Sequence, residues 1–160
     1  MPNWCHNRVE IYSDNPEDLK QIKSIFESER PLHQITPEPD WATIPLAKEH
    51  STKYGNKVGE IGELPVPPDP NEKWSTPTFK STGRADERWY DWRISHWGIK
   101  WDLDTRDIEI QDWDDHQITY TFETPWGPPE YICSALREKF EDISITWFFD
   151  EPGCELAGYL

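Results

Sequence analysis

The distribution of proline constrains the fold of this chain more than any other feature. Nine of its fifteen prolines lie between residues 31 and 88, together with four of its eight glycines. Proline fixes a backbone torsion and lacks an N–H donor, so a stretch such as LPVPPDPNEKWSTPTF cannot form an ordinary helix or a central strand. The segment still holds large apolar anchors: Trp41, Ile44, Leu46, Trp74 and Phe79. We predict an irregular, Pro-rich insertion at about 31–91, carried by a fold that the two ends of the chain build.

The N-terminal end has the pattern of a strand followed by a helix. In HNRVEIYS, Val9 and Ile11 alternate with polar residues, which is typical of a half-buried strand. The next run, SDNPEDLKQIKSIFESE, offers Asn15 as a helix cap and Pro16 at the first helical position. Its apolar residues recur at helical spacing, so we expect a helix that ends near residues 28–30.

The C-terminal end predicts three strands and a second helix. DIEIQDW and HQITYTFE alternate on either side of a short polar turn, which indicates a hairpin. We expect Ile108 and Ile110 to face the core with the apolar residues of the second run. PWGPPEYICSALREKF then predicts a helix with Tyr131 on its apolar face, ISITWFF predicts a strand, and CELAGYL predicts a short extension.

This order of elements is the split βαβ pattern of a ferredoxin-like domain. The expected fold is α+β, a four-stranded antiparallel sheet with two helices on one face. At 160 residues the chain is long enough for one such domain, residues 1–160, with its own hydrophobic core. We expect WRISHWGIKWD, residues 92–102, to cover part of the opposite face of the sheet.

The charge of the chain disfavours several classes of function. Its net charge is −15, and residues 101–160 hold 15 acidic side chains against three basic ones. Such a surface repels phosphate, so direct nucleic-acid binding is disfavoured, whereas solubility or a basic partner is favoured. No run has the length of a membrane span, no secretory leader is evident, and three widely spaced cysteines predict free thiols. We therefore expect a cytoplasmic protein without membrane contact.

Polar residues that stand among tryptophans form a candidate pocket: Asn3, Trp4, Cys5, Asn7, His96, Trp97, Lys100, Trp101, Asp102 and Trp126. Cys5 and His96 are the residue types of a nucleophile and its base. The paired spacing of a structural metal site is missing, so we expect neither a metal nor another cofactor. The residues favour packing, with Gly98 allowing a close turn, and on this interpretation the protein is not an enzyme.

The blocks MPNWCHNRVEI, HWGIKWD, FETPWGPP and DEPGCELAGY, in this order, resemble the signature blocks of the YubB-like family. That family comprises small proteins of phages, conjugative plasmids and other mobile elements, described as containing a ferredoxin-like domain. The sequence departs from the usual Asn, Thr and Ser at His96, Ile99 and Gly127, and residues 31–88 lie outside the resemblance. The resemblance implies the same fold and a mobile-element origin, and it supplies no catalytic residues.

An acidic run forms the candidate partner-binding surface: Asp102, Asp104, Asp107, Glu109, Asp112, Asp114 and Asp115. Mobile elements have to survive restriction and CRISPR systems, whose effectors expose basic nucleic-acid grooves, so we expect a host protein with a basic surface as partner. The hypothesis is inhibition of a defence nuclease or CRISPR effector by a surface that mimics DNA. One row of carboxylates is too sparse for this, because duplex DNA carries a charge every ~1.7 Å of its axis. The alternative is a small-molecule binder or enzyme that uses a pocket near Cys5, His96 and Asp102.

Overall fold

The computed structural model describes residues 2–46, 63–67, 76–80 and 85–160. The chain divides into two compact units, one made of Met1–Pro37 with Arg93–Leu160 and the other of Glu38–Trp92. The second unit interrupts the first in the sequence, and its bounds lie close to those of the predicted insertion. That residues 1–160 act as a single domain stays a prediction.

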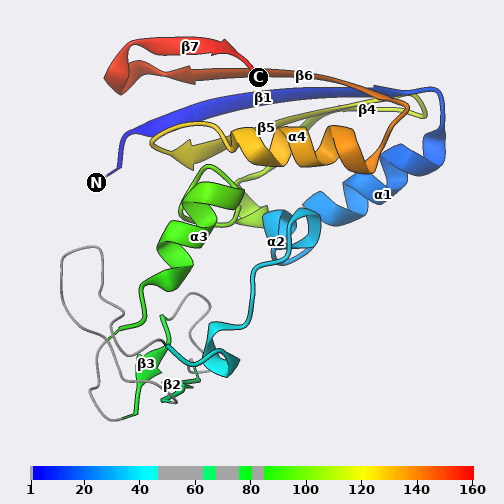
Figure 1. The fold of residues 1–160 in the computed structure, drawn as a ribbon. Helices are drawn as coiled ribbons and strands as arrows, with labels where there is room; N and C mark the ends of the chain where they lie inside the picture. Colours follow the sequence, from blue (N-terminus) through cyan, green and yellow to red (C-terminus); the bar gives the residue numbers. More distant parts are fainter. Residues whose placement is uncertain (1, 47–62, 68–75, 81–84) are drawn as a thin grey trace. The chain divides into compact units, whose positions relative to one another are not determined.

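The first unit contains a five-stranded antiparallel sheet with the strand order β4-β5-β1-β6-β7 (Figure 1). The bounds of its strands are β1 Trp4–Ser13, β4 Glu109–Trp113, β5 Gln117–Pro125, β6 Ile143–Glu151 and β7 Leu156–Tyr159. The four expected strands are present in the arrangement of a ferredoxin-like domain. The CELAGYL extension forms β7 and pairs with β6. The sheet therefore has five strands instead of four, with β4 and β7 as its edges.

β1 is the middle strand, and its alternation gives the sheet two unlike faces. Val9 of β1 lies opposite Tyr120 of β5 on one side and opposite Trp147 of β6 on the other. Every second residue of β1 is buried, and these residues are Cys5, Asn7, Val9, Ile11 and Ser13. The residues between them are exposed. The predicted half-buried strand is confirmed; we name its buried side the inner face of the sheet and its exposed side the outer face.

Two helices cover the inner face, as Figure 1 shows: α1 Pro16–Phe26 and α4 Glu130–Lys139. α1 begins as predicted, because the side chain of Asn15 accepts a hydrogen bond from the backbone N–H of Glu17. At its other end Phe26 stacks on Tyr120 of β5, with ring centroids 4.5 Å apart. The prediction of two helices on one face is confirmed.

The core between the inner face and the helices is rich in aromatic rings. Trp147 and Tyr120 are fully buried, and Phe122 meets Trp147 edge-on with ring centroids 5.8 Å apart. Each aromatic side chain buries a large area. This is why a chain with only 35% hydrophobic residues builds a core here.

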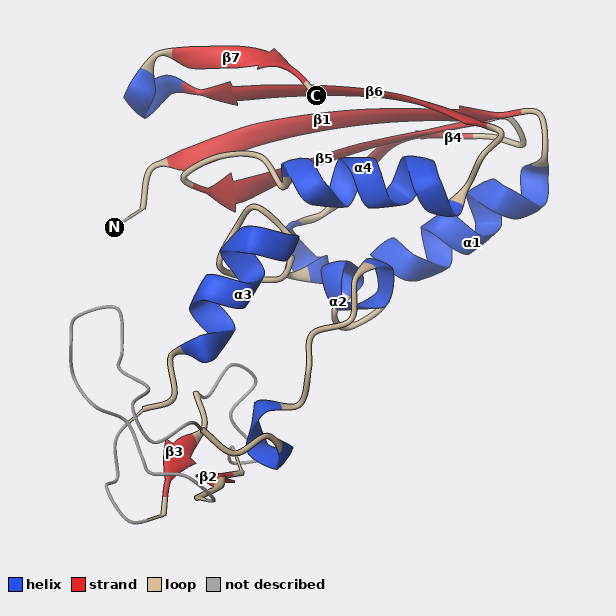
Figure 2. Cartoon of the chain, viewed as in Figure 1, coloured by secondary structure: helices blue, strands red, loops and turns tan. Residues whose placement is uncertain are grey.

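The sequence pattern did not predict two further helices, α2 Pro31–Ile35 and α3 Arg88–His96, which are both visible in Figure 2. Pro31 occupies the first turn of α2, where a missing N–H leaves no helical hydrogen bond unmade. α3 takes in the first half of WRISHWGIKWD. Within the described parts of the chain, no helix is long and apolar enough to cross a membrane.

The prediction that Ile108 and Ile110 face the core is wrong. All five residues of β4 are exposed, Ile110 by 41%, and Ile108 precedes the strand and is only half-buried. β4 is an edge strand with a register irregularity between Ile110 and Asp112. An edge strand has a neighbour on one side only, so the helices that cover the central strands bury it less. Tyr131 of α4 is also exposed instead of lying on the apolar face.

Besides the start of α3, the described residues of the second unit form short elements: η1 Trp41–Thr43, β2 Pro65–Val66 and β3 Thr78–Phe79. β2 and β3 pair antiparallel. Of the predicted anchors, Leu46 and Phe79 are buried together, whereas Ile44 is 38% exposed. Trp74 lies outside the described residues. The described residues of this unit therefore include one small buried apolar pair, Leu46 and Phe79.

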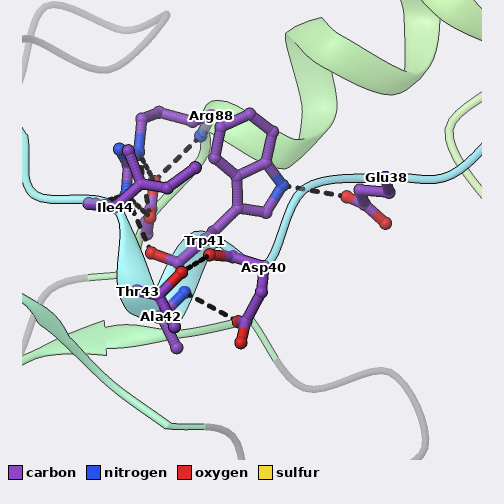
Figure 3. A network of polar contacts seen from close by, with 8 residues as sticks. Glu38, Asp40, Trp41, Ala42, Thr43, Ile44 and Arg88 are labelled. Atoms are coloured by element: carbon purple, nitrogen blue, oxygen red, sulfur yellow. Dashed lines mark hydrogen bonds and ion pairs between the residues drawn. The ribbon is translucent and has the colours of Figure 1, made fainter.

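Arg88 joins the parts of this unit through one guanidinium group (Figure 3). It donates to the buried carboxylate of Asp86 at 2.8 Å and to the carbonyl oxygens of Trp41 and Ile44 at 3.1 and 2.7 Å. The guanidinium carbon also lies 5.1 Å from the centroid of the Trp41 ring. The indole N–H of Trp41 donates in turn to Glu38 at 3.0 Å. A planar donor fork over an aromatic ring suits arginine and not lysine.

Candidate functional site

Asn7, one of the predicted pocket residues, lies in a buried polar network on the inner face. Its amide donates to Oγ1 of Thr124 at 2.8 Å and to the carbonyl oxygen of Cys5 at 3.0 Å. Its Oδ1 accepts a hydrogen bond from the indole N–H of Trp147 at 3.0 Å, and Thr124 donates to the carbonyl oxygen of Gly127 at 2.7 Å. Buried polar groups require such partners, so Asn7 ties the three central strands together.

Cys5 is fully buried on the inner face beside this network. Burial raises the pKa of its thiol to about 11; a hydrogen bond with Thr124 acts against that rise, and the charge of Glu151 adds to it. A nucleophilic cysteine has a lowered pKa, because the thiolate is the reactive form. His96, its predicted base, is exposed at the end of α3, where its Nδ1 lies 2.8 Å from Oγ of Ser95. The environment of Cys5 therefore favours packing over nucleophilic chemistry.

The tryptophan-rich stretch packs on the helical side of the sheet, so the prediction that it covers the outer face is wrong. Trp97 is fully buried, and its indole N–H donates to the carbonyl oxygen of Thr36 at 2.9 Å. The guanidinium of Arg93 lies 5.1 Å from the ring centroid of Trp97. Gly98 has a φ of +90°, and a Cβ there would lie 3.1 Å from the backbone N of Glu130 in α4. Glycine is required at so close a left-handed turn.

Asp102, which belongs to both predicted sets, is buried and fixes the start of α2. Its carboxylate accepts hydrogen bonds from the backbone N–H groups of Leu32 at 2.8 Å, His33 at 3.0 Å and Leu103 at 2.8 Å. Nε of Arg30 lies 3.9 Å from the same group. Burial raises the pKa of Asp102, although these N–H donors and Arg30 act to lower it. The carboxylate faces the interior and is not part of the exposed acidic surface.

The other predicted pocket residues lie in separate places. Trp126 is 56% exposed, and its backbone N–H donates to the carbonyl oxygen of Asn3. Nζ of Lys100 lies 4.1 Å from the ring centroid of Trp101. Trp4 is exposed on the outer face. The predicted residues are thus divided between the inner face, the outer face and the connecting loops.

Six of the predicted partner-binding residues follow one edge of the sheet, and we name them the acidic edge: Asp104, Asp107, Glu109, Asp112, Asp114 and Asp115. Asp104 pairs with Arg106 at 2.6 Å at the start of η2, Thr105–Asp107. The carboxylate of Asp114 accepts hydrogen bonds from the backbone N–H groups of His116 and Gln117 in the hairpin turn, and these donors lower the pKa of Asp114. The other four residues of the edge are exposed. The run is therefore partly structural, at Asp104 and Asp114, and otherwise open to solvent.

The outer face is hollowed beside this edge. A hollow of about 740 Å³ lies over β1, β5 and β6 and reaches η2 and β4. Residues that line it include Trp4, His6, Arg8, Glu109, Glu123, Phe148 and Asp150. A second hollow of about 270 Å³ shares Arg8 and continues along β1 past Glu10 and Tyr12. The larger hollow has the volume of a ligand-binding site. Of the predicted pocket residues, the exposed Trp4 lines it, and it also borders Asn7, whose side chain is buried on the inner face.

Strand register arranges the outer-face residues in rows across the sheet. His6 lies opposite Glu123 of β5 and opposite Asp150 of β6, and its Nδ1 is 2.8 Å from Oε1 of Glu123. One row further along, Arg8 lies opposite Phe148. Sequence reasoning missed the meeting of His6, Glu123 and Asp150, because Glu123 and Asp150 come from distant strands that only the register brings to one level. Their outward positions in alternating runs were the available signal.

The lining of the two hollows is negatively charged. Six carboxylates stand against two guanidinium groups, a net −4 with histidine neutral: Glu10, Asp107, Glu109, Asp112, Glu123 and Asp150 against Arg8 and Arg106. Both arginines already have acidic partners: Arg8 forms a salt bridge with Glu10 at 2.7 Å, and Arg106 forms one with Asp104 at 2.6 Å. In the described ranges no group of three His, Cys, Asp or Glu side chains could hold a metal ion. The negative charge of the lining favours a cationic group over an anionic one.

Comparison with known proteins supports the fold. Residues 97–160 match the family model described as the ferredoxin-like domain in Api92-like protein. The crystal structure of a protein api92 from Yersinia pseudotuberculosis is similar over 99% of this chain and 93% of that chain, with a TM-score of 0.50 and 14% sequence identity. At that identity the likeness shows the fold alone. No curated protein matches the chain. The YubB-like resemblance and the mobile-element origin stay predictions.

Proposed function

We propose that this protein acts by binding another protein, whose surface is basic, through the acidic edge and the adjoining outer face. The observation that carries the proposal is the exposure of β4: every side chain of this edge strand is open to solvent, and it borders hollows with a net charge of −4. Complementary charge steers encounter and selects partners. A nucleic acid would instead be repelled by the same surface.

The narrower form of the proposal is mimicry of DNA toward a host nuclease or CRISPR effector. Neighbouring strands lie ~4.8 Å apart, and alternate residues along a strand lie ~7 Å apart. Glu10, Glu123 and Asp150 therefore add further rows of carboxylates behind Glu109 and Asp112 of the edge. This supplies the second row that the linear sequence lacks. It supports a nucleic-acid groove as the basic surface that the partner offers.

The test compares two variants with equal changes in charge. The first neutralises Asp107, Glu109, Asp112 and Asp115 to Asn or Gln, and the second neutralises the exposed residues Glu29, Glu138, Glu141 and Asp142 of the helical side. Both variants and the original protein are used as bait in host lysate, and calorimetry from 50 to 300 mM salt measures the partner's affinity. We expect the edge variant alone to lose roughly tenfold or more in affinity and to show a flatter salt dependence.

A competition assay tests the narrower form. Duplex DNA is added to the complex of this protein with the partner recovered above, and we expect DNA to displace the protein. Simultaneous binding of DNA and protein would exclude DNA mimicry. Equal losses in the two charge variants would exclude the edge as the contact and leave only a general effect of net charge.

A further inference from the structure

We infer that the larger hollow of the outer face is a socket for an arginine side chain of the partner. The inference rests on the proposed function for its partner, and it names the chemistry of one contact within that surface. The socket consists of Trp4, His6, Glu123, Phe148 and Asp150, all of which line the hollow. Its members come from three strands and meet only through the register of the sheet.

The floor of the socket is the row Glu123–His6–Asp150. Both carboxyl residues lie directly opposite His6, one on each neighbouring strand, so their backbones stand ~10 Å apart across β1. Glu123 is exposed and held toward His6 by the 2.8 Å contact, and Asp150 is half-buried. Two acceptor groups on either side of a central residue can receive the several N–H donors of one guanidinium group.

An aromatic ring lies on each side of this row. Trp4 precedes His6 by two residues on β1, and Phe148 precedes Asp150 by two residues on the antiparallel β6, so the rings fall on opposite sides of the carboxylates. Trp4 is 44% exposed, which leaves its indole accessible. Phe148 is held by Tyr159 of β7, with ring centroids 5.3 Å apart. Aromatic faces attract cations, and arginine stacks on them more readily than lysine.

The cations already on this surface do not fill the role. Arg8 is bound by Glu10 at 2.7 Å and Arg106 by Asp104 at 2.6 Å, so each has a carboxylate outside the socket row. The carboxylates of Glu123 and Asp150 therefore remain for an incoming guanidinium group, with Glu123 also in contact with His6. The hollow, at about 740 Å³, exceeds one side chain and leaves room for the backbone of an extended segment beside it. Bidentate pairing and stacking together select arginine.

The experiment uses capped peptides of glycine and serine that carry one central residue. The full chain is titrated with the arginine, lysine and citrulline forms, and NMR follows the indole N–H of Trp4 and the backbone amides of His6, Glu123 and Asp150. We expect the arginine peptide to shift these signals, the lysine peptide to bind more weakly, and neutral citrulline to shift nothing. Glu123→Gln with Asp150→Asn should raise the dissociation constant about tenfold, and Trp4→Ala roughly two- to fivefold. Glu138→Gln with Asp142→Asn is the matched control.

The outcomes separate this inference from the proposed function. Equal shifts from the arginine and citrulline peptides, or equal losses in the socket variant and its control, would overturn the socket. A variant in which only Asp112 and Asp115 of the edge are neutralised, residues that do not line the larger hollow, should still bind the arginine peptide at the socket. If it does so yet binds the whole partner as tightly as the original protein, the edge proposal fails while the socket stands.

Discussion

The two faces of β1 use neighbouring residues for opposite purposes. On the inner face, side chains are buried and bonded across three strands, as Asn7 is with Thr124 and Trp147. On the outer face, His6 and Arg8 stand exposed, and their polar contacts are with single carboxylates. Adjacent positions of one strand are therefore under different physical constraints. Inner residues are set by packing and by the need for hydrogen bonds, and outer residues are open to selection for binding.

The largest expected loss of stability follows from a substitution on the inner face, at Asn7. Asn7→Ala removes the acceptor of the Trp147 indole N–H and the donor to Thr124, which leaves buried polar groups without partners. We expect a loss of about 3 kcal/mol in the free energy of unfolding. A chain of this size should then melt ~6–12 °C lower. Arg8→Ala, one residue along and on the outer face, should cost less than about 0.5 kcal/mol. Similar losses in the two variants, measured by urea denaturation, would remove the distinction between the faces.

The next largest effect on stability is expected within the acidic run, where the buried Asp102 is compared with the more exposed Asp104. Asp102→Ala leaves the backbone N–H groups of Leu32, His33 and Leu103 without their acceptor, so we expect a loss of about 2 kcal/mol. The loss is smaller than at Asn7 because the cost of burying a carboxylate disappears with it. Asp104→Ala, at a more exposed site, should cost under about 1 kcal/mol. Thermal unfolding of both variants checks the order, and a larger loss at Asp104 would contradict it.

The buried carboxyl group of Asp102 should also make the stability of the fold depend on pH. Burial raises its pKa, so the folded chain holds this proton more tightly than the unfolded chain does. The stability gained from that proton is fully present below the unfolded pKa and is lost as pH rises through the raised folded pKa. The stability of the original protein relative to Asp102→Asn should therefore decline from acidic toward neutral pH. A relative stability that rises over this range would show that the backbone N–H donors outweigh burial.

The sequence predicts those elements whose burial leaves a periodic trace. β1, α1, β5, α4 and β6 follow from alternation or helical spacing, because each presents one side to the core. The periodic pattern fails for the exposed β4, where Ile110 points away from the core, and for the short helix α2, whose start depends on the distant carboxylate of Asp102. Short elements held by contacts remote in sequence leave no local signal.

The candidate site was predictable only along one continuous stretch of the sequence. The acidic edge lies in a continuous run, so it can be found in the sequence. Asp102 belongs to the same run but is buried, where its carboxylate accepts hydrogen bonds from backbone N–H groups. Glu123 and Asp150 stand in different strands, and their meeting across His6 depends on register. A shift of one residue would turn either carboxylate to the inner face. Alternation gives the face of a residue, but not its neighbour on the next strand.

A moderate effect is expected at Cys5, on the inner face. Cys5→Ser places a hydroxyl where a thiol packs and should cost about 1 kcal/mol at neutral pH, without loss of partner binding. Because burial raises the pKa of Cys5 to about 11, the native thiol stays protonated at a pH where the unfolded thiol ionises. That contribution is complete below the unfolded pKa and is lost as pH rises through about 11. The stability gap between the two proteins should therefore narrow above pH ~9. Lost binding with an unchanged melting temperature would revive a chemical role for the thiol.

The smallest effect concerns Cys154, the exposed cysteine beyond the end of β6, and it is read from a labelling rate. A hydrogen bond to the carboxylate of Glu151 raises the pKa of the Cys154 thiol, and a hydrogen bond from Asn3 acts to lower it. A thiol reagent should modify Cys154 first in the native protein, because Cys5 and Cys133 are buried. Its rate at pH 8 should be below that of an ordinary exposed thiol, since less thiolate is present. Glu151→Gln should speed the reaction and Asn3→Ala should slow it. If both variants change the rate in the same direction, altered exposure of Cys154 and not its pKa controls the reaction, and the assigned contacts are wrong.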